Sequence, residues 1–232
     1  VFILSDESTI RSQGGFLTTD LDYDDRYLVS ALVRRDGSSL FGPDERWHNY
    51  YRISGGWRMA NEAWWPFEQV DEFRLRYSRG TAGGRPNFAD RFEVFQVQSG
   101  GRLSLQTLGN RRLKPEKTTE QEFGLDMVLF RRLSLEMNYA KQVTEDQLLN
   151  VPLPVMFGFN SQWQNAGTIE GTSFELEARM QVINNRQLGW TIGVVADRSR
   201  SKITEFNAPC FTTGFQYRCA GEEIGTMKVP MW

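Results

Sequence analysis

The side chains that could do chemistry are few, and several of them alternate with apolar residues. Glu175 and Glu177 lie two residues apart, so a β-strand would place both carboxylates on one face, about 6.8 Å apart. That separation suits a pair of carboxylates in acid/base catalysis. Arg179 continues the same face. Because all three charges fall on one side of an alternating segment, we interpret them as side chains that line a water-filled space.

Arg74 and Arg76 repeat this arrangement in another alternating segment. Two cations on one strand face could clamp an anion, but they also suit the wet side of a sheet. Glu136 occupies the polar side of a third alternating segment. We expect all of these charges to border water, together with Glu175, Glu177 and Arg179.

The chain offers little for catalysis. His48 is the only histidine, so a Ser–His–Asp triad would need it, and a histidine-rich metal site cannot be assembled. Gly80–Gly84 lacks the spacing and the following helix of a phosphate-binding loop. We therefore expect neither an enzyme nor a cofactor or metal site.

Cys210 and Cys219 are the only cysteines, and they lie nine residues apart. An isolated pair with short separation suggests a local disulfide in an oxidising compartment. We expect that bond to pin one loop.

Aromatic side chains recur in the segments that look like loops. They could stack on sugar rings, or they could pack one loop against another, and the sequence leaves both open. The residues are Phe41, Trp47, Phe88, Phe157, Trp163 and Phe211. Phe41, Trp47, Phe157 and Trp163 are the candidates for ligand contact.

The element that organises these side chains is a hairpin over Thr119–Val143. Its first arm alternates Phe123, Leu125, Met127 and Leu129 with polar positions, and its second arm does the same with Leu133, Leu135, Met137 and Tyr139. Period two builds one apolar and one polar face. Each arm is about ten residues long, which suits a tilted strand that crosses a bilayer.

The same pattern predicts about eight strands. The expected segments are Phe16–Tyr23, Tyr27–Arg35, Asn49–Met59, Val70–Arg79, Thr172–Ile183 and Leu188–Ile203, together with the two hairpin arms, Glu120–Phe130 and the arm that ends at Val143. Short connections at 24–26, 60–69, 131–132 and 184–187 alternate with long ones. Gly80–Thr118 and Thr144–Thr168 are expected to be long loops.

Taken together, these features predict an all-β, antiparallel up-and-down meander that forms part of a large transmembrane β-barrel wall. Its short turns would be periplasmic and its long loops extracellular. Aromatic residues near strand ends, such as Tyr23, Tyr27 and Trp57, fit the girdles that mark the two membrane interfaces.

Composition agrees with this interpretation. The chain has 232 residues, a formal net charge of −2 and a sequence pI of about 5.6, so the basic footprint of a nucleic-acid-binding protein is missing. The mean hydropathy of −0.49 argues against helical membrane spans but not against barrel strands. Because the chain starts at Val1 and ends without a finished element, we interpret residues 1–232 as an internal part of a longer protein.

Several segments resemble one family. RRDGSSLFGPDERW (residues 34–47) with SGGWRM (54–59), and RRLKPEKTTEQEFGLD (111–126), are similar to signatures of SusC/RagA-type TonB-dependent outer-membrane transporters. Supporting segments occur in the same order. They are DDRYLVSALVRRDGSS (24–39), FRLRYSRGTAGGRPNF (73–88), NAGTIEGTSFELE (165–177) and GEEIGT (221–226).

The resemblance implies a partial TonB-dependent receptor barrel domain over residues 1–232, within a barrel of about 22 strands whose lumen holds a plug. It implies a place in the cell outer membrane, in contact with its lipid, and import of oligosaccharides or peptides. The implied partners are the TonB complex, reached through the plug outside this chain, a SusD-like surface lipoprotein lid, and a glycan or peptide ligand.

Two alternatives belong to other classes. A soluble β-sandwich that binds carbohydrate would bury the apolar strand faces against each other. An outer-membrane enzyme on a smaller barrel would need a nucleophile and a base, for which His48 is the single histidine available.

Overall fold

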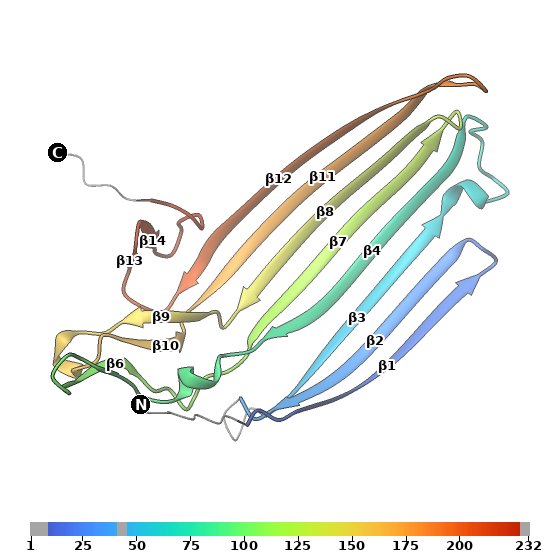
Figure 1. Ribbon diagram of the computed structural model, residues 1–232. Coiled ribbons are helices and arrows are strands. Elements are labelled where there is room, and N and C mark those ends of the chain that lie inside the picture. The colour runs from blue at the N-terminus through green and yellow to red at the C-terminus, as the bar shows by residue number, and fades with distance from the viewer. Residues whose placement is uncertain (1–8, 41–45, 228–232) are drawn as a thin grey trace, which may run out of the picture.

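The computed structural model describes residues 9–40 and 46–227, with only the backbone described for Phe88. Eight long strands form one sheet in the order β1-β2-β3-β4-β7-β8-β11-β12, and every neighbouring pair is antiparallel (Figure 1). The strands are β1 (Ser12–Tyr23), β2 (Tyr27–Ser38), β3 (Trp47–Arg58), β4 (Val70–Gly84), β7 (Glu116–Leu129), β8 (Leu133–Glu145), β11 (Gly167–Asn184) and β12 (Gly189–Phe206). The expected all-β meander of about eight strands is confirmed.

Within the residues that the structure describes, helical residues form only short 3₁₀ turns. They are η2 (Met59–Asn61), η3 (Phe88–Arg91) and η4 (Val155–Phe157). Among residues 9–40 and 46–227, no helix has the length and apolar character needed to cross a membrane.

The strand pairing places apolar residues of the two arms of the organising hairpin opposite each other. Phe123 lies opposite Tyr139, and Leu125 lies opposite Met137. On the neighbouring strand β4, Tyr77 lies opposite Phe123. Apolar residues therefore face apolar residues across successive strands, and the polar residues between them share the other face.

The strands are longer than predicted. They run from 12 residues in β1, β2 and β3 to 18 in β11 and β12, against about ten expected to cross a bilayer. The additional residues lie toward the long connections, where polar side chains such as Lys117 and Glu145 occupy the otherwise apolar face. Sheet hydrogen bonding therefore continues past the apolar band.

Two short connections share an unusual backbone. Asp24 and Asp25, and likewise Phe130 and Arg131, have φ values of 52° to 56°, in the left-handed region that side chains other than glycine rarely adopt. Each tight turn thus has three residues, one more than predicted for the β7–β8 hairpin, because Phe130 belongs to the turn rather than the strand. Asp71 supports this turn, since its Oδ2 accepts a 2.6 Å hydrogen bond from the Arg131 amide.

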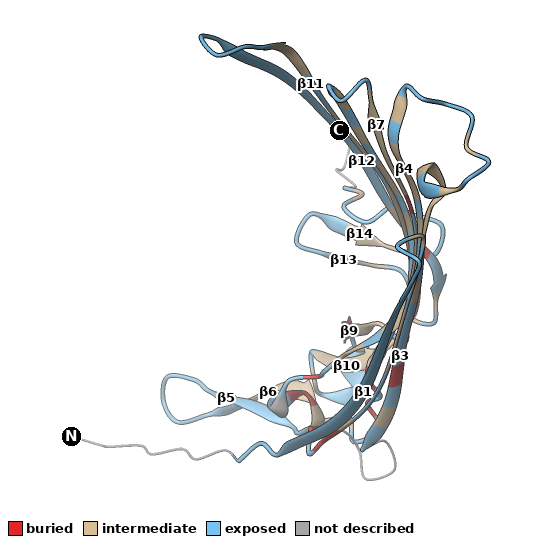
Figure 2. Ribbon diagram, turned by 90° about the vertical axis from the view of Figure 1, so that its right-hand side faces the viewer, coloured by how far each residue is buried: buried red, intermediate tan, exposed pale blue. Residues whose placement is uncertain are grey.

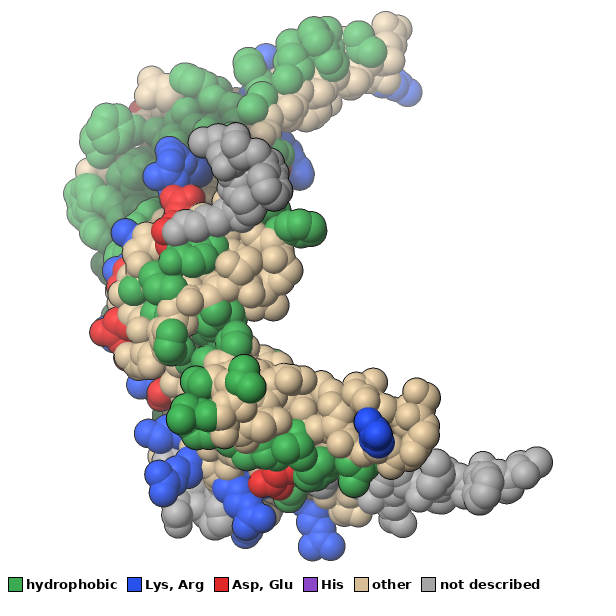
Figure 3. Space-filling view, turned by 90° about the vertical axis from the view of Figure 1, so that its left-hand side faces the viewer, with side chains coloured by type: hydrophobic (Ala, Val, Ile, Leu, Met, Phe, Trp, Pro, Cys, Tyr) green, Lys and Arg blue, Asp and Glu red, His purple; other side chains and the backbone are tan. Residues whose placement is uncertain are grey.

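The eight-stranded sheet is one curved layer (Figure 2). Its apolar face is the convex one, and Figure 3 shows hydrophobic side chains on this outer side. That face remains exposed: Phe123 is 53% exposed and Ile192 is 44% exposed. In the described residues no second sheet covers it. The β-sandwich alternative is therefore wrong, because a sandwich would bury these side chains between two sheets.

The long connections are not structureless, which corrects the prediction for residues 80–118 and 144–168. They hold β5 (Val94–Val97), β6 (Leu103–Leu108), β9 (Leu148–Pro152) and β10 (Ser161–Asn165), which form a second sheet in the order β5-β6-β10-β9. After β12, the strands β13 (Phe211–Thr213) and β14 (Gln216–Arg218) pair with each other. We call these six strands with η3 and η4 the loop platform; Figure 2 shows it on the concave side.

The loop platform has a buried core. Leu149, Val151 and Ala166 are 7%, 3% and 1% exposed, and Phe206 and Phe211 pack against them. These segments bury apolar side chains in the way of a water-soluble protein. The fold therefore combines an uncovered sheet with a compact cap at the long-connection ends of its strands.

Candidate functional site

The concave face of the sheet carries the charged residues picked out in the sequence. Arg74 and Arg76 come from β4, Glu136 from β8, and Glu175, Glu177 and Arg179 from β11. Side chains alternate along each strand, and the pairing puts Arg76 opposite Gly124 and Glu177 opposite Glu136. Strand period and register thus bring all six onto one face.

Asp126 on β7 is the centre of the most connected part of this face. Its Oδ2 accepts hydrogen bonds from Arg74 Nε at 2.7 Å and Arg76 Nε at 2.8 Å, and its Oδ1 accepts one from Arg76 Nη2 at 2.8 Å. Arg76 Nη2 also reaches Asn138 Oδ1 at 3.0 Å and Glu136 Oε1 at 3.4 Å. The two arginines are therefore held by protein carboxylates, which makes an empty anion clamp a poor description of them.

Gly124 makes this arrangement possible. A Cβ atom at this position would lie 2.8 Å from Arg76 Cζ, closer than side-chain carbons approach. Without that side chain the Arg76 guanidinium lies across β7 and reaches both Asp126 and Asn138. Sequence reasoning placed Gly124 and Asp126 on the polar face but did not identify this network, because the β4–β7 register cannot be read from either strand alone.

Glu175 and Glu177 have different surroundings. Glu177 forms an ion pair with Arg179 on its own strand. Glu175 borders a recess of about 280 Å³ whose polar lining includes Glu122, Gln142 and Ser199. The two carboxylates therefore do not act as an isolated pair, and the recess offers hydroxyl, amide and carboxylate groups to a polar ligand.

A second recess of about 350 Å³ lies on the same face, around the Asp126 network. Its walls include Arg74, Arg76, Glu136, Glu177 and Arg179. Charges of both signs thus surround this space, so it can hydrogen-bond donors and acceptors of a ligand alike.

The structure separates the four aromatic candidates for ligand contact. Trp47 is the first residue of β3, on the same face as Tyr51, and Arg35 Cζ lies 5.3 Å from its ring centroid. This is the convex face, so the placement favours a membrane interface over ligand contact. Phe41 lies outside the described residues.

The other two candidates belong to the loop platform. Phe157 ends η4 and is 55% exposed, so it remains free to contact a ligand or another protein. Trp163 is half-buried in β10, and its carbonyl accepts a 2.9 Å hydrogen bond from Asn110 Nδ2. Phe211 packs on Phe206 at 5.8 Å between ring centroids, which is contact within the platform.

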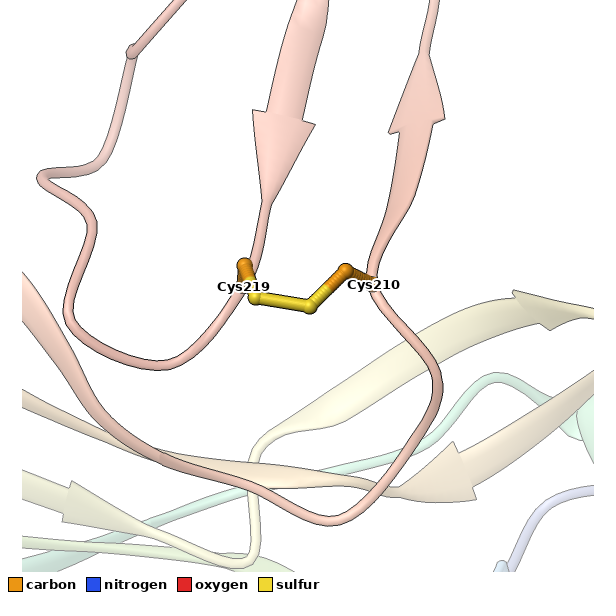
Figure 4. Close-up of a disulfide and its surroundings, with 2 residues drawn as sticks. All are labelled: Cys210 and Cys219. Carbon is orange, nitrogen blue, oxygen red and sulfur yellow. A yellow bond between two sulfur atoms is a disulfide. The ribbon is translucent and has the colours of Figure 1, made fainter.

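Cys210 and Cys219 are joined in a disulfide across the base of the β13–β14 hairpin, with 4.7 Å between their Cα atoms (Figure 4). The nine-residue separation closes a small loop, as the spacing suggested. In residues 9–40 and 46–227 no three His, Cys, Asp or Glu side chains are grouped to hold a metal ion.

A row of neighbouring aromatic rings lies at the strand ends that carry the short connections. Tyr23, Tyr27, Trp57 and Trp64 follow one another with ring centroids 6.3 to 6.4 Å apart. Beneath them, Glu62 Oε1 accepts hydrogen bonds from Tyr27 Oη at 2.6 Å and from Trp57 Nε1 at 2.9 Å. These two bonds hold the pKa of Glu62 below its usual value.

Comparison with known proteins gives one consistent assignment. The family model described as "TonB dependent receptor-like, beta-barrel" matches residues 3–217. TonB-dependent receptor P39 of Formosa agariphila is 31% identical over 216 residues, which cover 89% of this chain and 21% of that protein. TonB-dependent receptor SusC of Bacteroides thetaiotaomicron is 29% identical over 196 residues, which cover 78% of this chain and 19% of SusC.

A solved structure agrees with the sequence comparisons. The RagAB peptide transporter matches with a TM-score of 0.80 and 25% identity, covering 91% of this chain and 25% of the other chain. The chain thus spans about a fifth of the length of the curated relatives it matches. It belongs to the TonB-dependent receptor β-barrel family, and it is SusC/RagA-like in sequence and fold.

Proposed function

We propose that this chain forms part of the barrel wall of a TonB-dependent importer in the cell outer membrane. The observation that carries the proposal is the single curved sheet, with an exposed apolar convex face and a charged concave face. An exposed apolar surface of this extent is unfavourable in water and favourable in lipid. The concave face would then line an aqueous passage, with Arg74, Arg76, Glu136, Glu175, Glu177 and Arg179 as lumen-lining residues.

Two rows of aromatic residues support this orientation. One follows the short connections through Tyr23, Tyr27 and Trp57. The other crosses Tyr77, Phe123, Tyr139 and Phe174, which are paired in register on neighbouring strands. Aromatic rings prefer the interfaces of a membrane. Where the two rows meet they lie two residues apart along the strands, because Trp57 pairs with Leu75 and Tyr77 with Gly55. By the pattern of bacterial barrels, the short connections would be periplasmic.

The ligand is proposed to be an oligosaccharide or a peptide. The two concave recesses present hydroxyl, amide and carboxylate groups, which suit the hydroxyl groups of sugars and the amides of peptides. No residue is assigned a bond-making or bond-breaking role. Transport would depend on a plug domain outside this chain and on the TonB complex that acts through it, as the family membership suggests.

The loop platform is the proposed contact for a SusD-like surface lipoprotein lid. Val155 and Met156 are 94% and 86% exposed at η4, and Val97 and Leu103 on the β5–β6 hairpin are 69% and 68% exposed. Exposed apolar side chains gathered on one surface are typical of protein interfaces. The RagAB transporter, whose name pairs two components, is the structural relative that motivates this partner.

An uptake assay tests the proposal. The full-length protein is expressed in a host that lacks it, with and without a functional TonB complex, and fluorescent oligosaccharides and peptides of matched size are offered. We expect one ligand class to accumulate only when both the protein and TonB are present. Uptake that is independent of TonB, or recovery of the protein in the soluble fraction without detergent, would contradict the proposal.

A further inference from the structure

The convex face of β12 changes character within four residues. Trp190, Ile192, Val194 and Ala196 alternate on this face from the short connection upward, and Arg198 and Arg200 continue the same phase. Alternate residues of a strand lie about 6.8 Å apart. The two guanidinium groups therefore stand directly above the apolar band on the outer side of the sheet.

The strand register shows that this change occurs where the outer aromatic row ends. Arg198 lies opposite Phe174, and Phe174 continues the row through Tyr139 and Phe123. The next row toward the long connections contains Arg79, Gln121, Lys141, Thr172 and Arg200. Three cations and two uncharged polar residues thus replace the aromatic residues one step beyond the band. Figure 3, which faces the long-connection edge, shows Lys and Arg side chains along the outer rim.

Two of the outer lysines have acidic partners. Lys141 Nζ lies 3.0 Å from Glu170 Oε2, and Lys117 Nζ lies 3.7 Å from Glu145 Oε2. Lys202 faces Glu223 across an isolated bridge. Arg198 and Arg200 on β12, which is the edge strand of the sheet in this chain, are exposed and form no ion pair within residues 9–40 and 46–227.

We propose that Arg198 and Arg200 bind the phosphate group of an anionic membrane lipid whose acyl chains lie on the apolar band of β11 and β12. The inference rests on the proposed membrane orientation. Each guanidinium can bind phosphate oxygens with two parallel hydrogen bonds. A lipid is favoured over free phosphate because Val194, Ala196 and Phe174 continue the surface below the arginines as an apolar track.

The charge distribution restricts the site to this face. Asp197 and Ser199, the residues between and beside the arginines, belong to the concave side, where Ser199 lines the recess around Glu175. A lumen ligand would therefore not meet the arginines. The nearest convex carboxylate, that of Glu170, is already engaged by Lys141.

Native mass spectrometry of the full-length protein in mixed micelles tests the site. The probes are phosphatidic acid, phosphatidylcholine of the same acyl chains, and inorganic phosphate as a soluble competitor. The variant is Arg198→Gln with Arg200→Gln. Its matched control is Arg132→Gln with Arg186→Gln, which removes two cations from short connections at the opposite edge of the sheet.

We expect the wild type to retain phosphatidic acid about tenfold better than phosphatidylcholine, the arginine variant to lose that preference, and the control to keep it. Equal retention by the arginine variant would overturn the inference. Full displacement by inorganic phosphate would also overturn it, because the site would then bind a free anion. Insertion into vesicles, measured on the same samples, separates the two proposals: insertion without lipid preference refutes the lipid site alone, whereas failure to insert refutes both.

Discussion

The long sheet and the loop platform use apolar residues in opposite ways. In the platform and the connections to it, Leu113, Leu149, Val151 and Ala166 are buried. In the eight-stranded sheet the buried apolar residues are Tyr50 and Ile203, both near the long-connection ends of their strands. The middle of the sheet exposes its apolar residues, among them Leu75, Phe123 and Ile192.

This contrast is what the proposed membrane orientation requires, in which one chain is adapted to two solvents. Where water surrounds the chain, apolar side chains must cover one another. Where hydrocarbon surrounds it, a single layer of strands is sufficient, because lipid covers the apolar face and backbone pairing satisfies the polar groups. The boundary between the two solvents then falls between the outer aromatic row and the cation row that follows it.

The largest predicted effect comes from a charge placed on the convex face. Leu125→Arg in the full-length protein should destabilise the vesicle-inserted fold by about 2–4 kcal/mol, because the guanidinium would enter the hydrocarbon. Urea titration of the vesicle-inserted protein measures it. The matched change Ser78→Arg, on the concave face of the neighbouring strand β4, should cost much less. Equal losses for the two variants would refute the assignment of the faces.

Removing core volume from the platform should have a smaller and more local effect. Val151→Ala should destabilise the β9–β10 region by about 2 kcal/mol through lost burial and a small cavity, since Val151 is 3% exposed. Limited proteolysis between residues 146 and 166 measures it. Val155→Ala makes the same chemical change at a side chain that is 94% exposed and should leave cleavage unchanged. Faster cleavage in both variants would argue against a platform core.

A substitution in the Asp126 network on the concave face should destabilise the protein less than a charge on the convex face or a cavity in the platform core. Gly124→Ala should displace the Arg76 guanidinium and cost about 1 kcal/mol from lost contacts to Asp126 and Asn138. The control is Gly193→Ala, where a Cβ atom would make only an ordinary 3.8 Å contact with Arg179 Cγ. The urea midpoints of the two variants are compared. A Gly124→Ala protein as stable as the control would refute the claim that this glycine leaves room for the Arg76 guanidinium.

The smallest predicted effect is the pH dependence of stability that comes from Glu62, in the short connection between β3 and β4. Hydrogen bonds from Tyr27 and Trp57 hold the pKa of Glu62 low, so the folded state binds fewer protons at this group than the unfolded state does. Its stabilisation is complete above the usual pKa of a glutamate and is lost as pH falls through the lower, folded-state pKa.

The thermal midpoint of wild type minus that of Glu62→Gln should therefore shrink as the solution is acidified. Glu68→Gln, at an exposed position in the same connection, provides the comparison and should show no such trend. A Glu62→Gln difference that stays constant across the acid range would exclude the carboxylate as the group that titrates.

Much of the sheet was predictable because its physics is local. Alternation alone put Phe123 and Leu125 on one face of the first arm and Met137 and Tyr139 on one face of the second, and the structure places all four on the same side of the sheet. Strand ends were less predictable. Trp47 looked like a loop residue because β3 was expected to begin at Asn49, and two further residues of strand place its ring on the convex face.

The platform could not be predicted in this way. Its sheet depends on the parallel pairing of β6 with β10, in which Thr107 meets Ser161, and short segments so far apart carry no periodic signal. The network around Asp126 was likewise hidden, because it needs the β4–β7 register as well as each strand's phase. Pairing between distant segments, rather than local pattern, determined what was missed.

The most direct measurement is a spin-label scan along β8 of the full-length protein in lipid vesicles. Labels at residues 133 to 139 are tested with oxygen, which concentrates in hydrocarbon, and with a water-soluble nickel complex. We predict that oxygen broadening peaks at Leu133, Leu135, Met137 and Tyr139, and that nickel broadening peaks at Ser134, Glu136 and Asn138. If both reagents favour the same positions, or neither shows a period of two, the two sides of the sheet do not face lipid and water.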